Sequence, residues 1–287
     1  MTTHSNFSEI AEQMLGDYDA HTPGTTFANG FRLSISDAYR LQAEVARLRQ
    51  RRGERLTGYK IGCVYPGNQK KHGLTHPVHG RLWSTEQHVS NVSLTIDTFA
   101  NLAIEGEIAI SLRHDVITKH PTIQDIAEAV DEVFTVIELH NLVLHGDDPT
   151  GAELIANNAI HAGVVYSVGV RPPTTGDYID LSVALNERTV GHWRNRQWPD
   201  DVLAAIPWLV SELAKDGHQL KAGQKILTGA WGPPLPVEQP QSRATLTHQT
   251  GKKVPHVITR SSDKTIANRA SAVSTLFGSV TASFTTR

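Results

Sequence analysis

Two glutamates separated by one glycine, Glu105-Gly106-Glu107, are the residues of this chain whose types and spacing most directly suggest chemistry. In an extended strand, side chains alternate between the two faces, so both carboxylates would point the same way. Neighbouring carboxylates repel each other, and burying them requires a compensating charge. A divalent cation supplies that charge, and oxygen ligands suit a hard one such as Mg²⁺ or Mn²⁺. An exposed edge strand with solvated glutamates is the alternative, and it explains the pair better when the pair stands alone.

A third carboxylate lies in another β-prone stretch. Residues 133–139 form an apolar run that favours a strand buried on both faces, so Glu138 near its end would need a partner. If the run ends at the surface, Glu138 is solvated instead. His140 follows two residues later and would face the same way on a continued strand, which makes it the best acid–base candidate among the histidines.

Lys60 and the remaining histidines complete the set of titratable candidates. The stretch 56–63 favours a strand, with a glycine two residues to either side of Lys60. The lysine is either an active-site group or a structural ion-pair partner of a glutamate. Four other histidines are possible acid–base groups by ordinary pKa alone, but we expect most of them at the surface; they are His72, His76, His79 and His161.

The elements that must position these side chains are many short strands with a few helices. Helical patterns cover residues 7–15, the stretch after the capping sequence at Ser34, residues 122–131 and residues 202–215, where Pro207 should kink the helix or delay its start. Residues 66–81 read as a polar loop, either a lid or a surface excursion. A closing hairpin is expected over 244–258. Because strands and helices do not alternate regularly, the fold class is α+β.

Composition narrows the function. The chain has 287 residues, of which 39% are hydrophobic and 20% charged, and 27 basic against 29 acidic residues give a net charge of −2. This balance gives no electrostatic case for nucleic acid or a membrane surface. One cysteine, no signal-like N-terminus and no membrane-length apolar run fit a cytoplasmic protein. Neither zinc-binding spacing nor nucleotide-binding or serine-hydrolase motifs occur.

Several stretches in order resemble one family, the 2-keto-4-pentenoate hydratases, which include 4-oxalocrotonate decarboxylases and belong to the fumarylacetoacetate hydrolase superfamily. The resemblance covers residues 30–258, and the matching stretches are Gly58-Tyr59-Lys60-Ile61-Gly62, Glu105-Gly106-Glu107, Val136-Ile137-Glu138, Asn158-Ala159 and Thr228-Gly229-Ala230. It implies a mixed β-roll over 56–259 with a metal at its mouth, preceded by a small helical segment over 1–55. Residues 260–287 are rich in Ser and Thr, and we expect a mobile or peripheral tail there.

The resemblance also assigns roles to residues. Glu105, Glu107 and Glu138 match the family's Mg²⁺ or Mn²⁺ ligands, and Lys60 matches its active-site lysine, with His140 as the acid–base candidate beside them. Substrate contacts are expected from four residues: Tyr65, Asn158, Thr228 and Gly229. The implied substrates are small 2-keto or 2-hydroxydienoate acids from aromatic catabolism, and the family assembles as homo-oligomers.

Three departures from the family pattern bear on the substrate. The family's Gly-Leu-Thr-Ser after the lysine reads Gly62-Cys63-Val64-Tyr65 here, its Asp-Ser-Arg run reads 141–143 as Asn-Leu-Val, and its Ala-Asp-Asn-Ala-Ser reads 156–160 as Ala-Asn-Asn-Ala-Ile. The lost Arg and Asp are consistent with removal of one structural salt bridge. The lost hydroxyls predict a larger or more apolar substrate pocket.

Three functions therefore compete. The first is a metal-dependent hydratase, that is, a lyase, acting on a 2-hydroxydienoate through a metal-stabilised enolate. The second is a decarboxylase or a C–C hydrolase of the same superfamily, the latter requiring a histidine of the 66–81 segment to activate water. The third is a non-catalytic relative that serves as a partner subunit or ligand-binding protein.

Overall fold

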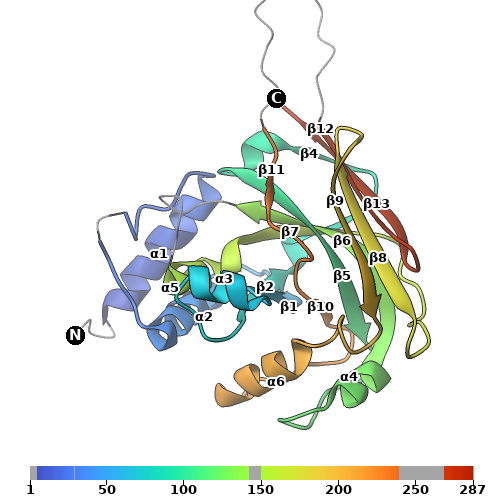
Figure 1. The fold of residues 1–287 in the computed structure, drawn as a ribbon. Coiled ribbons are helices and arrows are strands. Elements are labelled where there is room, and N and C mark those ends of the chain that lie inside the picture. The colour runs from blue at the N-terminus through green and yellow to red at the C-terminus, as the bar shows by residue number, and fades with distance from the viewer. Residues whose placement is uncertain (1–4, 29, 142–149, 239–267, 287) are drawn as a thin grey trace, which may run out of the picture.

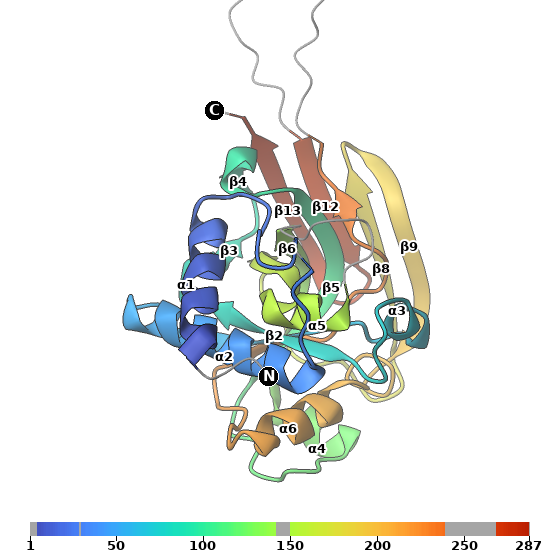
Figure 2. The same ribbon diagram turned by 90° about the vertical axis from the view of Figure 1, so that its left-hand side faces the viewer.

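Two curled β-sheets packed face to face form the body of the protein, and helices cover its ends (Figures 1 and 2). The structure is a computed structural model that describes residues 5–28, 30–141, 150–238 and 268–286. The larger sheet has the order β2 (Val78–Trp83), β1 (Leu56–Gly62), β10 (Lys225–Leu227), β5 (Leu102–Leu112), β6 (Val130–Asn141), β7 (His161–Tyr166) and β3 (Gln87–Val89), with β11 (Leu235–Pro236) also paired to β5. The smaller sheet has the order β4 (Val92–Thr95), β13 (Gly278–Thr285), β12 (Asn268–Ser274), β8 (Tyr178–Leu185) and β9 (Arg188–Gln197).

Both sheets mix parallel and antiparallel pairs, which confirms the combination of helices and strands expected from the sequence. β1 pairs in parallel with β10 and antiparallel with β2, and β13 pairs in parallel with β4. The helices are α1 (Ser5–Asp19), α2 (Ile35–Arg51), α3 (Pro66–Lys71), α4 (Ile123–Ala129), α5 (Gly151–Ala156) and α6 (Ile206–Lys215). No described helix has both the length and the apolar character needed to cross a membrane.

The strands β5 and β6 form the longest ladder in the larger sheet. They run antiparallel, and their register places Glu105 directly opposite Glu138. Every residue of β5 is buried, as are the last nine residues of β6. The edge-strand alternative for the two glutamates is therefore wrong, because β5 lies between β10 and β6 in the interior of the sheet.

The opposite face of β5 packs on the smaller sheet, and Gly106 is the point of closest approach. A Cβ atom at Gly106 would lie 2.2 Å from Val183 Cγ2 of β8. Large apolar residues fill the rest of this interface, among them Ile104, Ile108 and Leu181. The glycine between the two glutamates thus lets the sheets meet behind the carboxylates.

Replacing Gly106 by alanine is expected to destabilise the fold by about 1–3 kcal/mol, because one methyl group must displace Val183 or the strand that carries it. Chemical denaturation of Gly106→Ala, Val183→Ala and the double variant measures the effect. The smaller residue at 183 should recover part of the loss, so the two substitutions should be coupled rather than additive. A Gly106→Ala protein as stable as the parent would contradict the packing described here.

The N-terminal helices form a second, smaller apolar cluster with α5. Ala11, Ala38 and Leu41 are fully buried there, against Ile155. The capping sequence predicted at Ser34 is confirmed, since its side chain accepts a hydrogen bond from the Asp37 N–H. The delayed start predicted from Pro207 is also confirmed, because α6 begins only at Ile206.

Two expectations about irregular segments are wrong. Residues 66–81, expected as a loop, contain the helix α3 and most of the buried strand β2. The peripheral tail expected over 260–287 contains β12 and β13, which pair with each other and occupy the middle of the smaller sheet. Ala270, Ala272 and Phe284 point into the core, while the intervening Ser and Thr residues are less buried. The hairpin expected over 244–258 lies outside the described residues.

Candidate metal centre and substrate pocket

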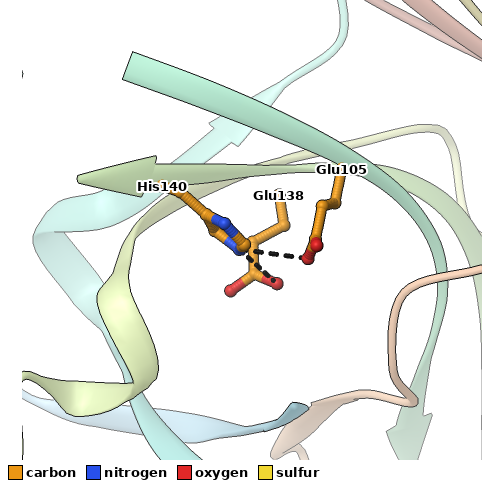
Figure 3. A group of neighbouring side chains, drawn as sticks. All are labelled: Glu105, Glu138 and His140. Atoms are coloured by element: carbon orange, nitrogen blue, oxygen red, sulfur yellow. Dashed lines mark ion pairs between the residues drawn. The ribbon is translucent and has the colours of Figure 1, made fainter. Parts of the chain in front are cut away.

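Three buried side chains converge where β5 and β6 pair (Figure 3). Cross-strand register brings Glu105 and Glu138 together, and the two-residue period of β6 puts His140 on the same face as Glu138. His140 Nε2 lies 3.2 Å from Glu105 Oε2 and 3.2 Å from Glu138 Oε2. The potential ligand atoms of these three residues all lie within 4.8 Å of one another.

Lys60 and Glu107 flank this cluster. Lys60 Nζ, from the neighbouring strand β1, lies 3.2 Å from Glu138 Oε1 and donates to the Ala159 carbonyl at 3.2 Å. Glu107 is completely buried, and its Oε2 accepts a hydrogen bond from the Gly229 N–H at 3.0 Å. Gly229 has a φ of +112°, which an L residue rarely adopts, so the turn after β10 aims this N–H at the carboxylate.

Burial and mutual charge perturb these groups in opposite directions. Burial, reinforced by the negative charge of Glu138, raises the pKa of Glu107 well above its ordinary value. Burial also favours the neutral form of Glu138, but Lys60 and His140 outweigh it and hold the pKa of Glu138 well below its usual range. Burial would lower the pKa of Lys60, yet Glu138, Glu105 and Glu107 raise it. The cluster therefore carries both charge signs at neutral pH.

His140 is shifted for the same reason. Burial disfavours its charged form, but the carboxylates of Glu105 and Glu138 raise its pKa to about 9. Without metal, the imidazole is consequently protonated at neutral pH. Any cation that binds between these carboxylates must compete with that positive charge.

The pH dependence of stability follows from this shift. The pKa of His140 is raised from 6.5 to about 9 on folding, so its stabilising contribution is complete below about pH 6.5 and disappears as the pH rises through 9. In a metal-free protein we expect the free energy of unfolding to fall between pH 6.5 and 9, by an amount on the order of 3 kcal/mol at full loss, and denaturant titrations across this pH range measure it. His140→Gln should flatten the decline in this pH window. An equally steep decline in that variant would show that another group is responsible.

The donor set fits a hard divalent cation. Glu107 Oε1, Glu138 Oε2 and His140 Nε2 are buried and have no hydrogen-bond partner within the described part of the chain. Leaving such atoms unsatisfied is costly, and a cation among them would satisfy several at once. Carboxylate oxygens favour Mg²⁺ and Mn²⁺, while a single imidazole is tolerated by several divalent metals.

A pocket opens onto the cluster from the side of α3 and the turn after β10. Its volume is about 580 Å³ including its mouth, and Lys60, Glu105 and His140 reach into it. Its remaining wall is largely apolar and includes Val64, Leu154, Ile160, Ala230 and Pro234. The apolar pocket predicted from the lost hydroxyls agrees with Val64 and Ile160, which line it at two of the altered positions.

The four expected substrate-contact residues differ in their placement. Tyr65 lines the pocket and is 36% exposed, with the Arg196 guanidinium 5.3 Å from its ring centre. Asn158 instead uses its amide on the strand β2, accepting from Arg81 N at 2.7 Å and donating to Arg81 O at 2.9 Å. Thr228 donates to the Ile108 carbonyl at 2.9 Å. These contacts favour structural roles for Asn158 and Thr228, and Gly229 acts on Glu107 rather than on the pocket.

Most of the histidines other than His140 were expected at the surface, and His161 does not meet that expectation. The residue is 1% exposed, and its Nδ1 lies 2.7 Å from Glu138 Oε1. Its position follows from a turn in which Asn158, Ala159 and Ile160 all have positive φ, a rare conformation for a β-branched residue such as Ile160. Nothing in the sequence pattern signals this turn, so the contact between β7 and Glu138 was not predictable.

The three histidines of the 66–81 segment also differ in their placement. His72 lines the pocket. His79 is buried on β2 with its ring stacked on Tyr39, and burial together with the Arg81 charge lowers its pKa to about 3. His76 stacks on Trp208, away from the carboxylates.

The known proteins that this chain resembles include hydratases. A 2-keto-4-pentenoate hydratase of Burkholderia vietnamiensis is 28% identical over 206 residues, which cover 70% of this chain and 78% of that protein. A 2-oxo-hept-4-ene-1,7-dioate hydratase of Escherichia coli is 29% identical over 224 residues, covering 72% and 80%. No family model matches the chain. The resemblance predicted from the sequence is confirmed by these relatives.

Solved structures share the fold. A 4-oxalocrotonate decarboxylase of Pseudomonas putida G7, complexed with magnesium and adipate, superposes with a TM-score of 0.79 and 18% identity over 99% of both chains. A fumarylpyruvate hydrolase of Pseudomonas aeruginosa, in complex with Mn²⁺ and pyruvate, gives a TM-score of 0.54 with 10% identity over 80% of this chain and 89% of that one. The first superposition includes the N-terminal helices and both sheets, since it spans nearly the whole chain.

Proposed function

Because this chain is a relative of the 2-keto-4-pentenoate hydratases, we propose that it is a lyase: a hydratase that depends on a divalent metal and acts on a small 2-hydroxydienoate or 2-keto acid. One observation carries the proposal. Three buried carboxylates, those of Glu105, Glu107 and Glu138, lie together with Lys60 and His140, and of these residues Lys60, Glu105 and His140 line a largely apolar pocket. A cluster of ion pairs with a purely structural role would not need to border a pocket.

The cofactor we propose is Mg²⁺ or Mn²⁺. Glu105, Glu107 and Glu138 would hold it, with His140 either completing the set or carrying a proton beside it. When bound, the cation would supply Lewis-acid stabilisation of negative charge on a substrate oxygen. The magnesium and Mn²⁺ of the two structural neighbours named above support this choice.

Side chains of the protein would bind the substrate, transfer protons and exclude water. The Lys60 ammonium lies at the pocket floor and would attract the carboxylate or keto oxygen of the substrate. His140 holds a proton at neutral pH and reaches into the same pocket, so it is placed to protonate a dienoate carbon and to take a proton from water in turn. Val64, Ala230 and Pro234 restrict access of bulk water around the reacting carbons.

The organisation we propose accompanies this function. The two sheets correspond to the mixed β-roll of the fumarylacetoacetate hydrolase superfamily, beginning at about residue 56 and including β12 and β13, and residues 1–55 form its helical N-terminal part. The protein is proposed to be a cytoplasmic homo-oligomer, in keeping with the family.

The test is turnover of a small substrate panel with Mg²⁺ or Mn²⁺ added. We expect 2-hydroxydienoates to lose their dienoate absorbance and to yield a hydroxylated product. Release of CO₂ from oxalocrotonate would instead indicate a decarboxylase. Absence of both activities, together with no metal bound at the three glutamates, would leave a non-catalytic binding protein.

A further inference from the structure

The turn between α5 and β7 supplies a direct contact to the Lys60 ammonium. Its Ala159 carbonyl accepts a hydrogen bond from Lys60 Nζ at 3.2 Å. The ammonium has one other partner among the described residues, Glu138 Oε1 at 3.2 Å. The position of the turn therefore helps to decide where the ammonium lies in the pocket.

The backbone of this turn does not follow local preference. Asn158, Ala159 and Ile160 have φ values of 55°, 51° and 58°, all in the left-handed region. Residues other than glycine normally enter this region singly, and such a conformation persists only where surrounding contacts hold it. The turn must therefore be held by a neighbouring element.

The side chain of Asn158 holds the turn on β2. Its Oδ1 accepts from the Arg81 N–H at 2.7 Å, and its Nδ2 donates to the Arg81 carbonyl at 2.9 Å. β2 stands at one end of the strand order of the larger sheet, so these two backbone groups are available to the turn. The carboxamide thus pairs with β2 as the backbone of a neighbouring strand would.

Gly80 lets the turn approach β2 so closely. It lies directly opposite Lys60 in the pairing of β1 with β2. A Cβ atom at residue 80 would lie 2.4 Å from the Asn158 carbonyl oxygen, which is a backbone atom and cannot rotate away as a side chain can. The carboxamide of Asn158 and the missing side chain of Gly80 together keep the turn beside Lys60.

We propose that Asn158 is a positioning residue: by pairing its carboxamide with β2, it fixes the Ala159 carbonyl where that carbonyl holds the Lys60 ammonium in the pocket. Gly80 is required for the same contact. This role rests on the proposed hydratase function, which assigns Lys60 to turnover. The placement of the ammonium itself depends on neither metal nor substrate.

Proton exchange of the Lys60 ammonium in the metal-free protein tests this placement. Protons held in a buried hydrogen bond exchange with water more slowly than solvated ones. Proton–nitrogen NMR of the lysine ammonium groups measures the exchange, and the Lys60 signal is the one that Lys60→Met lacks. Asn158→Gly removes the carboxamide while glycine adopts the positive φ freely. We expect the Lys60 ammonium to exchange roughly tenfold faster or more in this variant.

Turnover of the same preparations connects the placement to catalysis. With metal and substrate added, Asn158→Gly should lose roughly 10²-fold in kcat, the cost of displacing a reacting group by about 1 Å. Asn157→Ala is the matched control, because it removes the neighbouring carboxamide, which donates to the Glu153 carbonyl at 2.9 Å. This control should keep both the slow exchange and the turnover.

The outcomes separate this role from the hydratase function. Unchanged exchange in Asn158→Gly, or fast exchange already in the unaltered protein, would overturn the positioning role, and so would faster exchange with unchanged turnover. Faster exchange in a protein that turns over no substrate would count against the hydratase function alone. If Asn158→Gly does not fold, Gly80→Ala, which displaces the same turn, takes its place with the same expected results.

Discussion

Glu138→Gln is expected to raise the Kd for Mn²⁺ by more than the ~10–100-fold that loss of an outer-shell partner costs, and to remove metal-dependent turnover. Glu138 is the common partner of three side chains, since Lys60, His140 and His161 each lie within 3.2 Å of one of its oxygens. The glutamine keeps the shape but not the negative charge that attracts the cation. Calorimetric titration with Mn²⁺ measures the change.

The control is Glu132→Gln, an exposed glutamate on the same strand β6, which should bind Mn²⁺ as the parent does. Two further variants then identify the third ligand. If Glu107 is that ligand, as the family resemblance implies, Glu107→Gln should lose Mn²⁺ affinity and His140→Gln should retain it. The reverse order would assign the metal to Glu105, Glu138 and His140, the three residues whose ligand atoms converge here. Unchanged Mn²⁺ affinity in Glu138→Gln would refute both assignments.

Lys60→Met should separate chemistry from metal binding. The variant removes the only lysine that reaches the described pocket, so we expect turnover to fall by roughly 10²–10⁴-fold, the range of a positioned proton-transfer group. Metal affinity should be kept or increased, because one positive charge leaves the vicinity of three carboxylates. Steady-state kinetics and Mn²⁺ titration of the same preparation make the comparison.

Lys225→Met provides the matched control for that variant. Lys225 is a partly buried lysine on the adjacent strand β10, but its ammonium lies over the rings of Phe134 and Tyr166 rather than in the pocket. This control should keep most of the turnover. If Lys60→Met lost metal affinity together with turnover, the lysine would be a structural ion-pair partner of the glutamates and not an active-site group.

Much of the centre was predictable because it depends on short-range periodicity. Glu105 and Glu107 share a face by the two-residue repeat of a strand, and Glu138 and His140 do so on β6. The apolar run before Glu138 indicated that its carboxylate needed a partner. The register that places Glu105 opposite Glu138 pairs residues far apart in the sequence, so periodicity alone could not predict it. The family resemblance supplied that link.

Other parts were not predictable, for physical reasons that can be named. His161 reaches Glu138 through three successive residues with positive φ, and none of them is glycine, which would have signalled such a turn. The composition of β12 and β13 does not favour strands, so they were not predicted. Small alanines suffice on the inner face, where the two sheets lie close, and Ser or Thr occupies the other face. Alternation of Ala270, Ala272 and Ser274 with more exposed residues was present in the sequence, but the weak apolar contrast concealed it.

Because of Gly106, the motif Glu105-Gly106-Glu107 is constrained by packing as well as by chemistry. The two glutamates are constrained by the chemistry on one face of β5, whereas the glycine is constrained by Val183 on the other. A search for this three-residue signature therefore tests two independent requirements. The glutamates are required for the chemistry, and the glycine is required for the packing of the two sheets. In a relative whose second sheet is shifted away at this point, the middle residue would be free to diverge while both glutamates stayed, and the signature would miss an enzyme whose active site is intact.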